Sequence, residues 1–260
     1  MRAAPLADAL DIPLIDTKEF KGGQWDTLIV CKYWPKGIRQ HCNRLVLDSL
    51  DCWESTHPEM DVVEFWNWCY LELQFDVIIA TSTACSYRMS EALADYDVQV
   101  VLSPHHADPR IEPTWYDPNG PIVYAGGERF IIDEKQNIIE AARAIGREVR
   151  FDHTKAAWKA LKGASLAIAA RFGNTDTQLN RWCKPAVKIE NAAAAGLCCV
   201  ASDHPANWQM RQPNISYLYT DESETTWDWQ AAFETAYERG PLCNPIAIEN
   251  HIETMRGILS

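Results

Sequence analysis

Short apolar runs alternate with longer amphipathic stretches along most of this chain, and the alternation predicts its elements. The apolar runs expected to form strands are 28–32, 45–48, 75–80, 98–102, 122–125, 149–152, 165–170, 197–200 and 217–219. Apolar residues at helical spacing predict helices at 62–73, 84–96, 134–145, 154–161, 185–195, 225–238 and 245–259. Such alternation is typical of parallel sheets with helices on both faces, so the pattern predicts an α/β protein.

A dense group of prolines interrupts the alternation near the middle of the chain. The prolines are Pro104, Pro109, Pro113, Pro118 and Pro121. No helix tolerates that density, because each proline removes a backbone donor and clashes with the preceding turn. We therefore expect an N-terminal Rossmann-like domain at 1–108, a linker at 109–120, a second Rossmann-like domain at 121–243, and a C-terminal helix at 244–260 that packs back on the first domain.

Composition and charge narrow the class of protein. The formal net charge of −12 over 260 residues argues against a protein that coats nucleic acid, because phosphate backbones need a basic surface. The nine cysteines contain no Cys-x-x-Cys pair and no signal peptide is expected, so free thiols in a cytoplasmic protein fit best. We find no four-ligand zinc pattern and no apolar run of about 18 residues that could cross a membrane.

The stretch from Trp182 to Ser202 carries the most specific pattern in the chain. Pro185 suits the first turn of a helix, Gly196 suits its end, and the apolar residues that follow suit a buried strand. Lys184 and Lys188 are four residues apart, so we expect both on one side of the first helical turn. A helix N-terminus with two lysines beside it predicts a phosphate site. The alternative interpretation is a solvated lysine pair on an ordinary helix.

This stretch resembles the nucleotide-sugar-binding segment of GT-B glycosyltransferases, especially the family-four-like enzymes. Residues 46–53 resemble that group's hydrophobic-Asp-x-x-Asp-x-Trp strand end, 75–82 resemble its strand that leads to a serine, and 101–108 stand where the group has Ile-Pro-Asn-Gly-Val-Asp. The resemblance runs from about residue 26 to the C-terminus, with a trimmed N-terminal domain that lacks the usual glycine-rich loop. It implies two Rossmann-like domains facing across a cleft, which is the GT-B architecture.

The resemblance also implies an activity, namely transfer of a sugar from a nucleotide sugar to an acceptor hydroxyl. We expect a UDP-sugar as co-substrate, no covalently bound cofactor and no protein-bound metal. Ligands of open α/β sheets lie beyond the carboxyl ends of the strands. The donor-binding residues expected there are Gly126 and Gly127 for close approach of the diphosphate, the cations Arg129, Arg171, Lys184 and Lys188, and Glu190 or Asn191 for the ribose hydroxyls.

The sequence departs from the family at its glutamate pair. Asn191 has the spacing to Gly196 at which the family has the second Glu of its Glu-x7-Glu signature, and the first Glu has no counterpart. Retaining stereochemistry is therefore not implied. An inverting reaction needs a base for the acceptor hydroxyl. The candidates are Asp48, Asp51, His105 and His106, of which we favour Asp51 and His105.

Several alternatives stay open on the sequence. The acceptor could be a glycan, a lipid-linked sugar, a small molecule or a hydroxymethylated base of phage-type DNA. A protein of another class, a GT-B module that binds a nucleotide sugar without turnover, would also fit the trimmed N-terminal domain and the lost glutamate pair. A dinucleotide oxidoreductase is disfavoured, because no Gly-x-Gly-x-x-Gly follows any expected strand.

Overall fold

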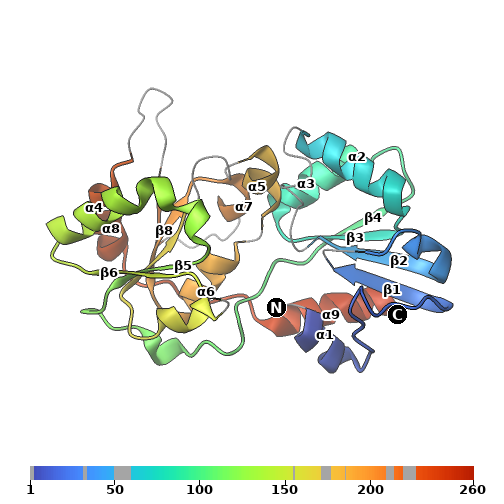
Figure 1. The fold of residues 1–260 in the computed structure, drawn as a ribbon, viewed down its shortest axis with the longest axis horizontal. Helices are drawn as coiled ribbons and strands as arrows, with labels where there is room; N and C mark the ends of the chain where they lie inside the picture. The colour runs from blue at the N-terminus through green and yellow to red at the C-terminus, as the bar shows by residue number, and fades with distance from the viewer. Residues whose placement is uncertain are drawn as a thin grey trace. The chain divides into compact units, whose positions relative to one another are not determined.

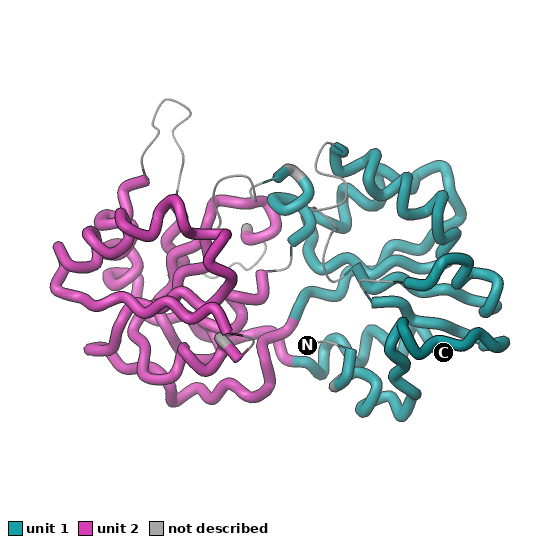
Figure 2. The backbone as a smooth tube through the Cα atoms, in the orientation of Figure 1, with its two compact units in different colours: residues 1–105, 177–185, 248–260 teal, residues 106–176, 186–247 magenta. Residues whose placement is uncertain are grey.

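The computed structural model of the protein describes residues 3–31, 34–49, 60–154, 156–170, 177–184, 186–208, 214–218 and 227–260. The chain folds into two compact units, shown in teal and magenta in Figure 2. Unit 1 comprises residues 1–105, 177–185 and 248–260, and unit 2 comprises residues 106–176 and 186–247. Each unit is built on its own sheet of parallel strands. The expected α/β class with parallel sheets is therefore confirmed.

Unit 1 has three layers around a four-stranded sheet. The strands lie in the order β1 (Trp25–Cys31), β2 (Cys42–Asp48), β3 (Val77–Ala80) and β4 (Gln99–Leu102). Helices α2 (Val62–Leu73) and α3 (Thr83–Ala92) cover one face, and α1 (Ala3–Leu10) and α9 (Ile248–Leu259) cover the other, as Figure 1 shows. Alternate residues of β2 serve the two cores, since Leu45 and Leu47 pack with Phe65 of α2 whereas Val46 packs with Met255 of α9.

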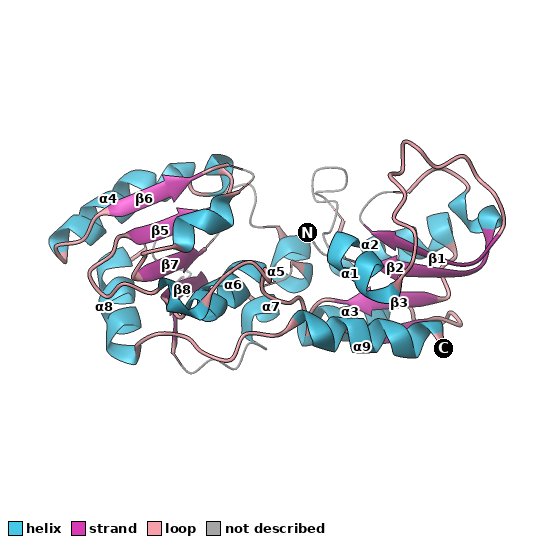
Figure 3. Ribbon diagram, turned by 90° about the horizontal axis from the view of Figure 1, so that it is seen from below, coloured by secondary structure: helices cyan, strands magenta, loops and turns pink. Residues whose placement is uncertain are grey.

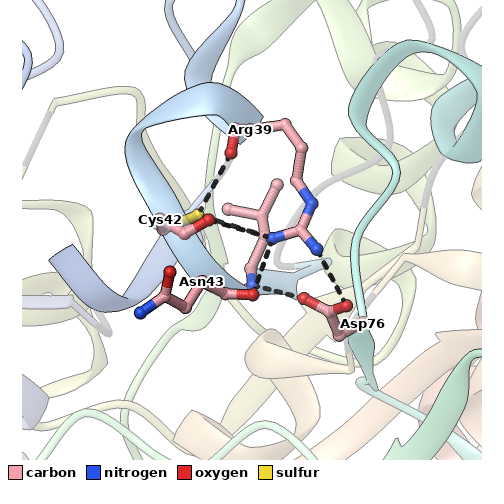
Figure 4. A network of polar contacts seen from close by, with 5 residues as sticks. Arg39, Cys42, Asn43 and Asp76 are labelled. Atoms are coloured by element: carbon pink, nitrogen blue, oxygen red, sulfur yellow. Dashed lines mark hydrogen bonds and ion pairs between the residues drawn. The ribbon is translucent and has the colours of Figure 1, made fainter. Parts of the chain in front are cut away.

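An arginine ties together the amino ends of β2 and β3 (Figure 4). Arg39, in the 3-10 helix η1 (Ile38–His41), donates to the carbonyl of Asn43 over 3.1 Å and to Asp76 Oδ1 over 3.1 Å. The other carboxylate oxygen of Asp76 accepts from the backbone N–H of Leu45 over 2.7 Å. This network fixes the register of the two strands at their starts, opposite the edge where ligands of such sheets bind.

Unit 2 is also three-layered, around a five-stranded parallel sheet. The strand order is β6 (Val149–Asp152), β5 (Ile122–Ala125), β7 (Leu166–Ala169), β8 (Cys198–Ser202) and β9 (Ile215–Leu218). Helices α4 (Lys135–Ala144) and α8 (Trp229–Arg239) pack on one face, and α6 (Val187–Ala195) packs on the other (Figure 3). The chain runs outward from β5 to β6 and then returns to the far side of β5, so the strand order reverses between β5 and β7. That reversal is the topological switch point at which open α/β sheets bind ligands.

The elements agree with the sequence where the local signal is strong. Each expected strand overlaps an observed one, and α2 has the expected bounds. Gly196 ends α6 with φ 68, in the left-handed conformation that favours glycine. The passage between β4 and β5 forms no α-helix, but Pro113 opens the short 3-10 helix η2 (Pro113–Trp115). Ile111 and Trp115 within that passage are buried in the core of unit 2. The C-terminal helix α9 packs in unit 1 with Leu6 of α1.

The structure differs from the expected elements in three places. Residues 178–183, for which no helix was expected, form α5 (Gln178–Cys183), whose Leu179 and Cys183 enter the core of unit 1. The helix expected at 134–145 starts one residue later, because residues 132–134 form a 3-10 turn before α4 begins at Lys135. Two short helices, α1 and α7 (Pro205–Trp208), were not expected, because neither has a long amphipathic pattern.

Candidate functional site

The turn after β5 lies at the switch point of unit 2. Strand β5 ends at Ala125, and Gly126 and Gly127 follow it directly. The backbone N–H of Gly126 donates to the carbonyl of Asp152 at the end of β6 over 2.9 Å, which continues the strand pairing by one residue. The hydroxyl of Tyr124 donates to the carbonyl of Gly127 over 3.1 Å. These two hydrogen bonds therefore hold the peptide groups on either side of the Gly126–Gly127 peptide.

Lys188 of α6 reaches this turn from the next layer. Its Nζ lies 4.0 Å from the centroid of the Tyr124 ring, a cation–π contact. A Cβ atom on residue 126 would lie 2.9 Å from Lys188 Nζ, closer than carbon and nitrogen tolerate. Gly126 is thus the residue that allows the ammonium group to approach the turn. The structure brings together Gly126, Gly127 and Lys188 from the set expected on the sequence.

A charged cluster borders the turn on the side of β6. Lys135 Nζ donates to Glu128 Oε1 over 2.8 Å, and His153 Nε2 lies 4.0 Å from the same oxygen. The hydrogen bond from Lys135, together with the charges of Lys135 and His153, holds the pKa of Glu128 below its ordinary value. Neither Lys135 nor His153 was singled out on the sequence. A single lysine at a helix start and a single histidine after a strand carry no spacing signal. The pairing of β5 with β6 brings His153 to Gly126, whereas Lys135 reaches Glu128 from the first residue of α4.

The other expected cations are placed differently. The guanidinium of Arg129 lies over its neighbour Phe130, 4.7 Å from the ring centroid. Lys184 ends α5 in an extended conformation and belongs to unit 1, whereas α6 begins only at Val187 in unit 2. The expectation that Lys184 and Lys188 share one helical turn was therefore wrong. Arg171 lies outside the described residues.

Glu190 and Asn191, the two ribose candidates, both hold other parts of unit 2. Glu190 is 1% exposed, and its Oε2 accepts from the backbone N–H of Ile246 over 2.7 Å. Asn191 Oδ1 accepts from the backbone N–H of Asp108 over 2.8 Å. Burial raises the pKa of Glu190 to about 7, and the hydrogen bond from Ile246 only partly offsets this. The two side chains thus fix the segments that lead into and out of unit 2.

The base candidates of unit 1 that the structure describes are Asp48 and His105. Asp51 lies outside the described residues, and His105 is half-buried. Asp48, at the end of β2, is fully buried with its Oδ2 3.9 Å from His251 Nε2. The other ring nitrogen of His251 lies 2.6 Å from the hydroxyl of Ser103. This buried network attaches α9 to the ends of β2 and β4, and no sequence signal joins residues so far apart in the chain.

His106, the last base candidate, is buried in unit 2, where its Nδ1 lies 2.6 Å from the carbonyl of Ala107. Across the described ranges, no three side chains of His, Cys, Asp or Glu are grouped so that they could hold a metal ion. None of the helices in those ranges is both long enough and apolar enough to cross a membrane.

Comparison with known proteins shows a shared fold. No protein-family model and no curated protein matches the chain. Among solved structures, a chain of the GtfA/B complex superposes with a TM-score of 0.54 at 12% identity, covering 91% of this chain and 57% of that one. The protein thus has the fold of part of that chain and spans little more than half its length.

Two further structures give weaker superpositions. The Glycosylation Associate Protein (Gap123) complex from Streptococcus agalactiae gives a TM-score of 0.46 at 12% identity, over 92% of this chain and 52% of that one. A glycosyltransferase from Rickettsia africae ESF-5 gives 0.35 at 10% identity, over 92% and 98%.

Proposed function

We propose that the protein is a glycosyltransferase of the GT-B type that takes its sugar from a nucleoside diphosphate sugar, with a UDP-sugar as the expected donor. The observation that carries the proposal is Lys188, whose ammonium group is held at the Gly126 turn on the switch point of unit 2. The sequence resemblance to family-four-like enzymes and the fold shared with a GtfA/B chain support it.

In this proposal the turn and Lys188 act by electrostatics. Breaking the bond between sugar and diphosphate leaves negative charge on the departing phosphate. An ammonium group held beside the turn stabilises that charge. Within the described part of the chain, the backbone N–H groups of Gly127 and Glu128 donate to no acceptor, so they are available to phosphate oxygens. The proposal includes no protein-bound metal.

The remaining expected residues keep proposed roles. The ribose contact is proposed for Glu190 Oε1, a buried atom without a hydrogen-bond partner among the described residues; the N–H of Ile246 donates to Oε2. Asp51 and His105 are the proposed bases for an acceptor hydroxyl if the reaction inverts. Arg129, Arg171 and Lys184 remain proposed donor-binding cations.

A panel of UDP- and GDP-sugars tests the function. The wild-type protein should bind at least one of them in calorimetry and should release nucleoside diphosphate when a glycan, a small molecule or hydroxymethylated DNA is offered as acceptor. Lys188→Ala should weaken binding at least several-fold, because a charge-assisted contact to phosphate is lost. Lys162→Ala removes the same charge from an exposed position of unit 2 and serves as the matched control. Equal losses in both variants would remove Lys188 from the site.

One observation favours a second candidate, a module that binds a nucleotide sugar without turnover. In both Glu190 and Asn191 a side-chain oxygen accepts a hydrogen bond from the backbone of unit 2. The residues expected to bind the ribose are therefore at least partly engaged within the protein. The same panel separates the two candidates. Binding that depends on Lys188, with no release of nucleoside diphosphate under any acceptor, would favour the binding module.

A further inference from the structure

His153 contacts the glycine turn directly. It follows β6, and its Nδ1 lies 2.6 Å from the carbonyl oxygen of Gly126. The register of the sheet explains the contact, because Ala125 pairs with Asp152 and the next residue of each strand therefore stands alongside the other. A carbonyl oxygen only accepts hydrogen bonds, so Nδ1 must carry the proton. The other ring nitrogen faces Glu128.

The bonded carbonyl belongs to the peptide whose N–H is that of Gly127. In a trans peptide the C=O and N–H groups point in opposite directions. Drawing the Gly126 oxygen toward His153 therefore directs the Gly127 N–H away from His153. That N–H donates to no acceptor within the described residues. The position of the Gly126 oxygen thus sets the direction in which the Gly127 N–H can donate to a phosphate.

A peptide between two glycines needs such a restraint. Gly127 has φ −64, and rotating the peptide by half a turn would give it a positive φ, which glycine adopts at no steric cost. The flipped peptide would present a carbonyl oxygen where the N–H now stands and would repel a phosphate. The backbone bond from Gly126 N–H to Asp152 does not prevent this rotation, because it belongs to the preceding peptide.

We propose that His153 is a positioning residue that locks the Gly126–Gly127 peptide with its N–H available to the diphosphate of the donor. The inference rests on the proposed function and deepens it. It assigns to His153 no contact with the reacting atoms.

Two amide variants distinguish the two ring nitrogens. The side-chain nitrogen of asparagine occupies nearly the position of histidine Nδ1, whereas that of glutamine reaches nearly the position of Nε2. His153→Asn can therefore still donate to the Gly126 carbonyl, while His153→Gln and His153→Ala cannot. We expect His153→Ala and His153→Gln to weaken UDP binding roughly tenfold, the effect of losing one hydrogen bond to a charged group. His153→Asn should stay within about twofold of the wild-type protein.

Calorimetry with UDP on the full chain, with thermal unfolding to confirm folding of each variant, is the experiment. Rescue by asparagine alone supports the inference. Wild-type affinity in His153→Ala, or an equal loss in His153→Asn and His153→Ala, overturns it and leaves the proposed function standing. A wild-type protein that binds neither UDP nor any UDP- or GDP-sugar overturns the proposed function, and the inference falls with it.

Discussion

Replacing Glu190 with glutamine should change how the stability of the protein depends on pH. Glu190 is buried in unit 2, and its folded-state pKa of about 7 stands against 4.5 for an ordinary glutamate. Because folding raises the pKa, Glu190 keeps its proton in the folded state between pH 4.5 and 7, where the unfolded state has released it. The stability contributed by this group is therefore complete below pH 4.5 and is lost as the pH rises through 7.

The magnitude follows from the size of the shift. A difference of one pKa unit corresponds to about 1.4 kcal/mol, so the shift costs the wild-type protein about 3 kcal/mol on going from pH 4.5 to above pH 7. Glutamine is neutral throughout and keeps an oxygen that can accept from the N–H of Ile246. Glu190→Gln should thus match the wild-type protein near pH 4.5 and exceed its stability by up to about 3 kcal/mol near pH 8.

Urea unfolding of both proteins across this pH range, followed by circular dichroism, measures the difference. Subtracting one curve from the other cancels the titration of groups that the two proteins share. Glu238→Gln makes the same chemical change at an exposed position of α8 and is the matched control. A difference between Glu190→Gln and the wild-type protein that does not vary with pH would refute the reasoning.

Two further variants test the fold and the glycine turn. Asp76→Ala removes the acceptor shared by Arg39 and the Leu45 N–H, and should lower the free energy of unfolding by about 1 kcal/mol, seen as a lower urea midpoint. A midpoint equal to that of the wild-type protein would show that the network is not stabilising. Gly126→Ala should displace the ammonium group of Lys188 and weaken UDP binding several-fold with little change in melting temperature. Gly257→Ala, which adds a methyl group where no atom lies within 4 Å, is its control, and equal affinities in the two glycine variants would contradict the assigned contact.

Local signals in the sequence were enough for most of the fold. The apolar run of β8 and the glycine before it depend on residues that are neighbours in the chain, and both were predicted correctly. The start of α6 was misplaced, because Pro185 was assigned to its first turn. A proline ring disfavours the helical conformation at the residue before it. Lys184 accordingly ends α5 in an extended conformation.

The candidate site was less accessible to sequence reasoning, because its contacts join distant segments. The approach of Lys188 to Gly126 depends on the packing of α6 against the sheet, and the contact of His153 with Gly126 depends on strand pairing. Glu190 was expected to face a ligand, yet one of its oxygens binds the backbone at Ile246, 56 residues along the chain. No periodicity or motif encodes such a partner.

The central claim is that unit 2 binds a nucleoside diphosphate at the Gly126 turn beside Lys188. A crystal structure of the protein with UDP at saturating concentration tests this most directly. We expect the diphosphate within hydrogen-bonding distance of Lys188 Nζ and of the Gly127 N–H. A diphosphate bound elsewhere, or a turn left empty at saturation, would contradict the account.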